Sequence, residues 1–183
     1  MCCSKRPMIR TRSRLLRAST GFPRVSRQRS EGAPGAPFGP GPARALDEAL
    51  KIAGEWGLIT KNHEGYVGTA DLCDKEDALH ILGHLDVVAP GEGWTVTKPY
   101  SPLREGDLLY GRGTDDDKGP VVASLLAMKA VKDLGAPLKA NCRMIMGTDD
   151  GQAVLHGVGE LDTRAHHQRP GYVGETAGGA GRP

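Results

Sequence analysis

The chain has 183 residues, enough for one ordinary domain, and its apolar share of 38% is low for a chain packed along its whole length. Nine of its 24 Lys and Arg lie within residues 1–30, where no Asp or Glu occurs, so the remainder carries 15 basic against 22 acidic residues. The basic overall balance therefore belongs to the N-terminal segment. The sequence contains no run of about 18 consecutive apolar residues, so no membrane span is predicted.

The N-terminal segment, residues 1–31, is predicted to be a disordered basic tail. Its Arg- and Ser-rich composition leaves three other roles open, namely binding to nucleic acid, binding to an anionic membrane and service as a transit peptide. A secretory signal requires an apolar stretch after its first basic residues, and none follows here. We therefore expect a cytoplasmic protein.

The four cysteines form no CxxC pair, so the sequence indicates neither a zinc ribbon nor a disulfide scaffold. Cys2 and Cys3 are interpreted as free thiols, with acylation as the alternative. Cys73 stands alone, and Cys142 lies in an apolar run that is typical of a small core residue.

The predicted domain, residues 32–150, begins with a loop over residues 32–42, which hold four prolines and four glycines. A helix is predicted over 43–56, because apolar residues recur at the spacing of one helix face and Gly57 follows as a cap. A β-prone piece comes next at 66–72. The apolar run 78–88 is typical of a buried strand.

A second helix is predicted over 120–134, with Pro120 in its first turn and Gly135 as its C-cap, and a further strand over 141–148. Strands that alternate with helices favour an α/β layered domain with much of its sheet parallel. Residues 151–183 show no sustained period and are expected to be an atypical C-terminal tail. The three predicted strands would need more partners than that tail offers, so we expect a domain that stops midway.

The first candidate site is the tetrapeptide Gly83-His84-Leu85-Asp86 near the end of a predicted strand, where open α/β folds place their ligands. Side chains alternate along a strand, so His84 and Asp86 share a face, and the carboxylate can orient the imidazole. An HxD pair alone is weak evidence, because a histidine beside a strand is more often only hydrogen-bonded.

The second candidate site is the acidic loop Asp115-Asp116-Asp117, between a glycine-rich turn and a helix start. A divalent cation would relieve the repulsion among these carboxylates, whereas the simpler interpretation is a solvated turn with one helix cap. The loop lacks the GxxxxGK[ST] pattern of a phosphate loop, and Gly119 stands where a calcium loop needs its third ligand.

The third candidate site is Asp149-Asp150, which closes the last predicted strand. Carboxylates at a strand end suit metal binding or general-base work, although an acidic turn is the more common explanation of such a pair. The three sites together, on one α/β frame, form a constellation that chance rarely supplies.

Three stretches carry a resemblance to a known family: GHLDVVAPGEGW, LLYGRGTDDDKGPVVASLLAMKAVKDLG and the strand that ends in GTDD. They resemble zinc-dependent dipeptidases of the aminoacylase, carboxypeptidase and desuccinylase metallopeptidase superfamily. PGAPFGPGPARAL is similar to a loop and helix of the dipeptidase and carnosinase-like branch, so the resemblance covers roughly residues 32–150. It implies a truncated N-terminal part of a three-layer catalytic domain with a mixed, largely parallel sheet.

The resemblance also implies roles for individual residues. His84 would ligate one zinc, Asp86 would orient its ring, and Asp116 would bridge two zinc ions and precede Asp117 through a cis peptide bond. In intact relatives a zinc-activated water hydrolyses the amide bond of a dipeptide or an N-acyl amino acid.

The chain departs from this family at the third motif, where relatives have a general-base Glu followed by a zinc-binding Glu and this chain has Asp150 and Gly151. Asp150 is one methylene shorter than Glu, and Gly151 has no ligand atom. Later ligands and the dimerisation domain have no counterpart that the sequence assigns, so the oligomeric state is not predicted. We expect hydrolysis by this polypeptide alone to be weak or absent. The alternatives are a non-catalytic metal- or partner-binding remnant of such an enzyme, and nucleic-acid binding through the basic tail.

Overall fold

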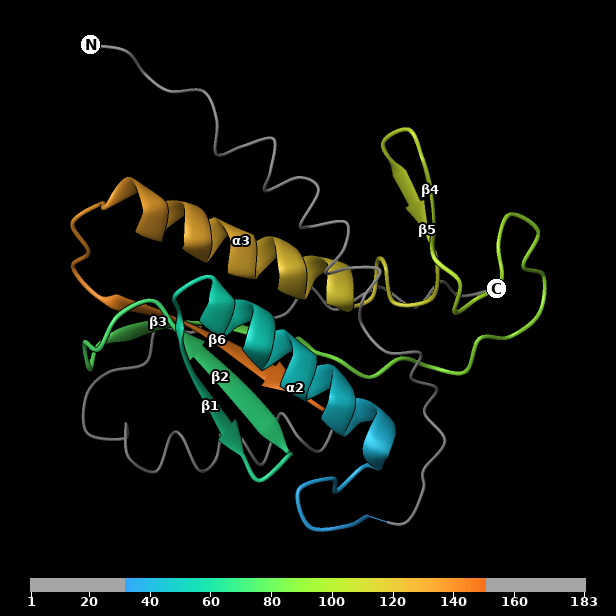
Figure 1. The fold of residues 1–183 in the computed structure, drawn as a ribbon, viewed down its shortest axis with the longest axis horizontal. Coiled ribbons are helices and arrows are strands. Elements are labelled where there is room, and N and C mark those ends of the chain that lie inside the picture. Colours follow the sequence, from blue (N-terminus) through green and yellow to red (C-terminus); the bar gives the residue numbers. More distant parts are fainter. Residues whose placement is uncertain (1–31, 151–183) are drawn as a thin grey trace, which may run out of the picture.

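The structure is a computed structural model that describes residues 32–150, and Figure 1 shows their arrangement. Four strands form one sheet in the order β1-β2-β6-β3, and two further strands, β4 and β5, form a separate hairpin. The two helices, α2 and α3, lie side by side on one face of the four-stranded sheet (Figure 1). The predicted tails, residues 1–31 and 151–183, lie outside the described residues.

Helix α2 spans Pro40–Glu55 and begins three residues earlier than its apolar spacing predicts. Its first turn contains two prolines, which are tolerated there because the first N–H groups of a helix have no acceptor within it. The predicted inward face is confirmed, since all four of its apolar residues are buried. They are Leu46, Ala49, Leu50 and Ala53.

Strands β1 (Ile59–His63) and β2 (Val67–Asp71) form an antiparallel hairpin after α2. The β-prone stretch at 66–72 is thus confirmed as β2, whose residues are all buried. Strand β1 was not predicted, because its sequence ITKNH is mostly polar and the strand lies exposed at the edge of the sheet. Its pairing with β2, rather than its own hydrophobic pattern, keeps it in place.

Strands β3 (Ala78–His84) and β6 (Asn141–Gly147) pair in parallel, and helix α3 (Lys118–Leu134) lies between them in the sequence. Helix α3 and strand β6 match their predicted positions to within two residues. Gly135 ends α3 with φ 61°, a left-handed conformation that glycine adopts without steric cost. Strand β3 is shorter and less buried than predicted, with Leu79 54% and Leu82 49% exposed, because it lies at the sheet edge among the described strands.

The sheet is mixed, as expected, but its described strands are not largely parallel. Strand β2 pairs antiparallel with both β1 and β6, and only the β3–β6 pairing is parallel. The tight turn between β1 and β2 reverses the chain, so these two neighbouring strands pair antiparallel. The α/β class itself is confirmed.

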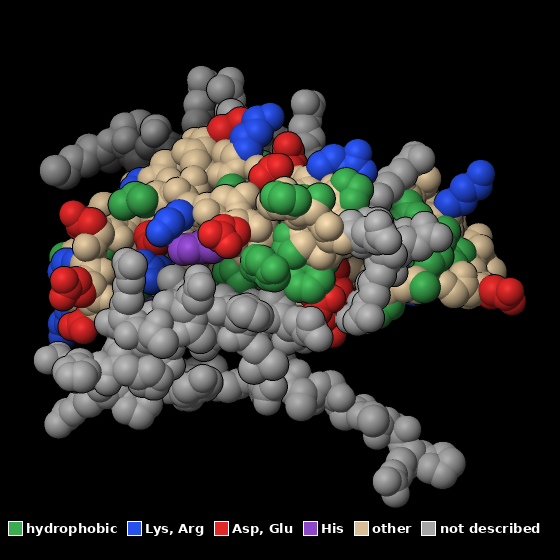
Figure 2. All heavy atoms as spheres, turned by 90° about the horizontal axis from the view of Figure 1, so that it is seen from below, with side chains coloured by type: hydrophobic (Ala, Val, Ile, Leu, Met, Phe, Trp, Pro, Cys, Tyr) green, Lys and Arg blue, Asp and Glu red, His purple; other side chains and the backbone are tan. Residues whose placement is uncertain are grey.

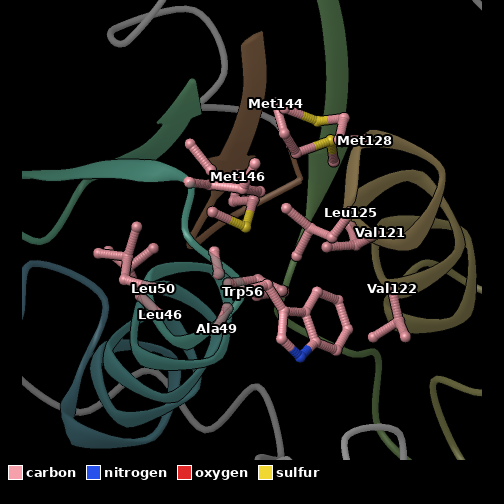
Figure 3. Close-up of a cluster of buried hydrophobic side chains, with 14 of the residues drawn as sticks. Leu46, Ala49, Leu50, Trp56, Val121, Val122, Leu125, Met128, Met144 and Met146 are labelled. Atoms are coloured by element: carbon pink, nitrogen blue, oxygen red, sulfur yellow. The ribbon is translucent and has the colours of Figure 1, made fainter. Parts of the chain in front are cut away.

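The main core lies between the helices and the sheet (Figure 3). Leu46 and Leu50 of α2, Leu125 of α3 and the two methionines Met144 and Met146 of β6 meet there, all at most 9% exposed. Cys142 packs partly buried against this cluster, which confirms its interpretation as a small core residue. Because this core fixes α3 against β3 and β6, it also fixes the loop that leads into α3.

The hairpin of β4 (Leu103–Glu105) and β5 (Leu108–Tyr110) stands apart from the main sheet (Figure 1). It was not predicted, because each strand has only three residues and neither shows an apolar alternation. Its outer side chains are exposed, Leu108 by 60%. The hairpin therefore belongs to the long connection between β3 and α3 rather than to the core.

On the face shown in Figure 2, acidic and basic side chains of the described residues lie near one another, without a broad field of one sign. Hydrophobic side chains gather in the middle of this view. Among residues 32–150, no helix is long and apolar enough to cross a membrane.

Candidate metal and catalytic site

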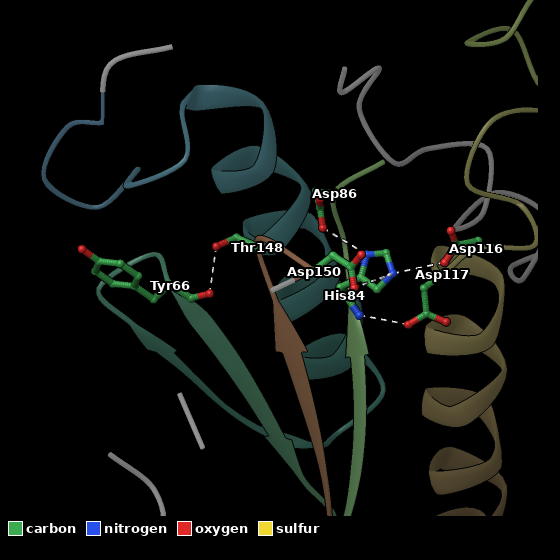
Figure 4. A network of polar contacts seen from close by, with 7 residues as sticks. All are labelled: Tyr66, His84, Asp86, Asp116, Asp117, Thr148 and Asp150. Carbon is green, nitrogen blue, oxygen red and sulfur yellow. Dashed lines mark hydrogen bonds and ion pairs between the residues drawn. The ribbon is translucent and has the colours of Figure 1, made fainter. Parts of the chain in front are cut away.

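The candidate site residues gather at the end of the sheet where strands β3 and β6 finish and helix α3 begins (Figure 4). The two strand ends remain in register there, because the N–H of Leu85 donates to the carbonyl of Gly147 over 2.8 Å. His84 closes β3 and Asp150 follows β6 by three residues, while Asp116 comes from the loop before α3. Residues distant in the sequence thus meet as the sequence predicted.

The imidazole of His84 lies between two carboxylates. Its Nδ1 is 3.0 Å from Oδ1 of Asp86, and its Nε2 is 3.1 Å from Oδ1 of Asp116. A carboxylate only accepts hydrogen bonds, so the ring donates from both nitrogens when it is protonated. The hydrogen bond with Asp86 raises the pKa of His84 from 6.5 to about 9, against the opposing effect of burial. Without metal, the ring is therefore an imidazolium at neutral pH.

Asp117 holds the backbone of His84. Its Oδ2 accepts the His84 N–H over 2.9 Å, and the Asp116–Asp117 peptide bond is cis, as the resemblance implies. Burial raises the pKa of Asp117, against the lowering effect of that hydrogen bond. Gly83 leaves the space for this contact, since a Cβ there would lie 2.6 Å from Asp117 Oδ2. Sequence reasoning did not identify this function of Asp117.

Lys118 is a second residue that sequence reasoning missed. It begins α3 next to the acidic loop, and it is only 6% exposed. Burial lowers the pKa of its ammonium group to about 8, although the charge of Asp86 acts in the opposite direction. A buried cation beside several carboxylates reduces the net negative charge of this end of the sheet. The signal in the sequence was its position directly after three aspartates.

The two aspartates that follow β6 have different surroundings. Asp149 is buried at 7% exposed, whereas the side chain of Asp150 is 64% exposed and its Oδ1 lies 4.0 Å from Nε2 of His84. Thr148 anchors this segment, because its hydroxyl lies 2.8 Å from each of the carbonyl oxygens of Gly65 and Tyr66. The anchor leaves Asp150 next to the imidazole. Gly151 lies outside the described residues.

The spacing of the polar atoms fits a metal ion held by His84 and Asp116. Two ligand atoms on one tetrahedral zinc, each about 2.0–2.1 Å from it, lie about 3.3 Å apart. The 3.1 Å between His84 Nε2 and Asp116 Oδ1 is close to that value. Within residues 32–150, however, no group of three or more His, Cys, Asp or Glu is arranged to hold an ion. The described part of the site therefore supplies two candidate ligands, His84 and Asp116, with the carboxylate of Asp150 farther away.

This arrangement also fits acid–base chemistry. Asp86 is 2% exposed and contacts the ring nitrogen that faces away from Asp116, so it fixes the orientation of the imidazole. Asp150 is a second exposed carboxylate, 4.0 Å from the same ring nitrogen that Asp116 contacts, and it can exchange protons with solvent. The structure thus brings together all four site residues that the sequence predicted.

Comparison with known proteins relates this fold and site to one family. Residues 80–169 match the model of peptidase family M20/M25/M40. The chain is 39% identical over 145 residues to the candidate dipeptidase YtjP of Bacillus subtilis (strain 168), covering 78% of this chain and 31% of that protein. A candidate dipeptidase of Staphylococcus aureus (strain USA300) is 40% identical over 115 residues, or 63% and 24% of the two chains. The chain spans about a third or less of the length of these relatives.

Two solved structures share the fold. Human carnosine dipeptidase 1 matches with a TM-score of 0.68 at 24% identity, over 86% of this chain and 37% of that one. The M20 family metallo-carboxypeptidase Sso-CP2 of Sulfolobus solfataricus matches with a TM-score of 0.54 at 22% identity, over 75% and 30%. The motifs, the fold and these matches agree in supporting an M20 dipeptidase-like partial catalytic domain.

Proposed function

We propose that this chain binds zinc at His84 and Asp116 and that its chemistry is the metal-dependent hydrolysis of dipeptide amide bonds. The observation that carries the proposal is the placement of one imidazole between Asp86 and Asp116, at 3.0 and 3.1 Å. A metal-binding histidine usually donates a hydrogen bond to a carboxylate from one ring nitrogen and binds the metal with the other. In His84 the second ring nitrogen faces Asp116. The family match over residues 80–169 supports the same conclusion.

Each residue has a distinct part in this proposal. Asp86 keeps the Nδ1–H of His84 in place, which leaves Nε2 free to bind once its proton is lost. Asp116 is the carboxylate ligand, and Asp150 is the base that removes a proton from the attacking water. A bound zinc would supply Lewis acidity, polarising the substrate carbonyl and lowering the pKa of water.

The same geometry predicts that turnover by this chain is low. The pair of ligands in residues 32–150 is fewer than the three protein ligands that catalytic zinc sites have. Asp150 is also one methylene shorter than a glutamate at the same position, so its carboxylate reaches less far. The alternative function, a non-catalytic metal- or partner-binding module, is favoured by the same two features.

Zinc titration of the metal-free full chain by calorimetry tests the metal site. We expect about one zinc per chain, and loss of this binding in His84→Ala. His80→Ala is the matched control, because His80 lies on the same strand four residues earlier and is exposed. Equal binding by wild type and His84→Ala would refute the site.

A zinc-dependent assay with a series of dipeptides distinguishes the two functions. Weak hydrolysis that vanishes in His84→Ala would support the enzyme, and zinc binding without turnover would support the module. Rates comparable with those of intact dipeptidases would contradict the expectation of low activity.

A further inference from the structure

A groove separate from the His84 site lies along the connection between β3 and α3. Its volume is about 460 Å³, and it runs between the loop after Pro90 and the end of β5. Trp94 and Arg112 form part of its wall, with hydroxyl-bearing side chains around them. These are Thr95, Thr97, Tyr110 and Thr114.

Arg112 has hydrogen-bonding capacity that the described protein leaves unused. Its guanidinium carbon lies 5.3 Å from the ring centroid of Trp94, and Nη2 donates to the carbonyl of Pro90 over 2.8 Å. Its Nε is buried without a hydrogen-bond partner. Among residues 32–150 no carboxylate forms an ion pair with this cation, although an arginine carries five N–H donors and a permanent charge.

The groove is connected to the proposed metal site through one loop. Thr114 lines it and precedes Asp116 by only two residues. The segment before this loop is held in place, because the N–H of Arg112 donates to the carbonyl of Pro99 and the hydroxyl of Thr114 donates to the carbonyl of Gly111. The groove and the proposed metal site therefore draw residues from the same loop.

We infer that this groove binds the free carboxylate of a small peptide substrate, with Arg112 as the residue that recognises it. The inference rests on the proposed function, because it assigns one end of the substrate. A planar guanidinium stacked on an indole suits a carboxylate, which it can bind through two parallel N–H donors. The hydroxyls of Thr95 and Tyr110 can donate to the same oxygens, whereas those of Thr97 and Thr114 already donate to the carbonyls of Ser101 and Gly111.

Glu92 also lines the groove and provides a test of the sign of the ligand's charge. It is exposed and forms no ion pair with Arg112 in the described structure. Its charge would repel a carboxylate, weakly because solvent screens it. Glu92→Gln is therefore expected to tighten binding by about two- to fivefold.

The indole N–H signals of the two tryptophans provide the measurement, in a two-dimensional ¹⁵N–¹H spectrum of the full chain with metal removed. The Nε1–H of Trp94 donates to the carbonyl of Pro90, the same atom that accepts from Arg112, so its signal should move when the groove is occupied. Trp56 is 6% exposed in the core and serves as the internal reference. Trp94→Phe assigns the two signals.

The probe is N-acetylglycine, which has a carboxylate and an amide but no amine, compared with the neutral N-acetylglycinamide. We expect only N-acetylglycine to move the Trp94 signal saturably, with binding about tenfold or more weaker in Arg112→Gln. Arg112→Lys keeps the positive charge and should retain part of the binding. A response to both probes, or to neither, overturns the inference, as does equal binding by inorganic phosphate.

Two features keep this result separate from the zinc result. The N-acetylglycine titration needs no metal, so a negative result there would not contradict zinc binding at His84. A failure of zinc to bind would likewise not affect the N-acetylglycine titration. If Arg112→Gln does not fold, the expected tightening in Glu92→Gln still decides the case. Weaker or unchanged binding in that variant would contradict a carboxylate ligand.

Discussion

At the scale of single residues, the charge of the His84 ring depends on Asp86. In the metal-free protein the pKa of about 9 arises chiefly from their hydrogen bond, and burial opposes it. Asp86→Asn removes the charge and keeps the shape, so the pKa of His84 should fall toward its ordinary value of 6.5. Imidazole NMR titration in the presence of a chelator measures this. The signal that is lost in His84→Ala assigns the His84 resonance among the six histidines.

The sign of this effect is definite. A raised pKa means that the folded protein favours the imidazolium, so this contribution to stability is present below pH 6.5 and disappears as the pH rises through about 9. An unchanged His84 pKa in Asp86→Asn would mean that the other nearby carboxylates dominate.

In the proposed mechanism Asp150 is the general base, and its short side chain limits how closely the carboxylate approaches the attacking water. Asp150→Glu adds the missing methylene and brings the carboxylate nearer to a water beside His84 Nε2. We expect zinc-dependent turnover to rise by about tenfold or more, since a well-placed base contributes roughly 100- to 10,000-fold. Asp150→Asn should abolish the activity that remains. Equal turnover by all three proteins would exclude Asp150 as the base.

Gly83 is predicted to be intolerant of any side chain. A Cβ there would lie 2.6 Å from Asp117 Oδ2 and 2.7 Å from Val121 Cγ2, so Gly83→Ala should lower the free energy of unfolding by about 1–3 kcal/mol. Chemical denaturation measures the loss. Gly54→Ala is the control, because its Cβ has only Thr60 Oγ1 within 4 Å, at 3.7 Å, and alanine there should stabilise helix α2.

At the scale of elements, α2 depends on a close approach to β2. A Cβ on Gly68 would lie 2.5 Å from Leu46 Cδ1, so the helix packs directly against the strand backbone. Leu46 is fully buried, and Leu46→Ala should cost about 2–5 kcal/mol of unfolding free energy. Lys51→Ala on the exposed face should change it by less than about 0.5 kcal/mol. Similar losses in both variants would contradict this packing.

The sequence predicted the elements that have a strong periodic pattern. Helix α2 showed apolar residues on one face, and α3 and β6 are long and bounded by glycine or acidic residues. Strands β1, β4 and β5 were missed because they are short and mostly exposed, so their stability comes from cross-strand pairing rather than from a pattern of their own. Strand pairing between distant segments is not encoded locally.

The candidate site was more predictable than the sheet. His84, Asp86, Asp116 and Asp150 were selected from their positions at strand and loop ends, and the fold brings them within 4.0 Å of the His84 ring. The supporting contacts were not foreseen, because the bond from Asp117 to the His84 backbone and the burial of Lys118 depend on how α3 docks.

At the scale of the whole molecule, β3 forms one edge of the described sheet and exposes apolar side chains. Such an edge can pair with a second copy of the chain. Leu82→Lys should therefore reduce concentration-dependent self-association, measured by light scattering during size-exclusion chromatography. Leu134→Lys is the control, because Leu134 is 81% exposed but lies on α3. An equal effect of both changes would indicate general surface hydrophobicity rather than edge pairing.

The position of His84 and Asp116 on either side of the β4–β5 hairpin has a mechanical consequence. An ion held by both residues would join the end of β3 to the start of α3 and close the intervening connection into a ring. Such a non-covalent cross-link restricts the unfolded chain as a disulfide does, and the restriction depends on the length of the closed loop. The groove that contains Arg112 lies within this ring, so an ion at His84 would also reduce the freedom of the groove's walls.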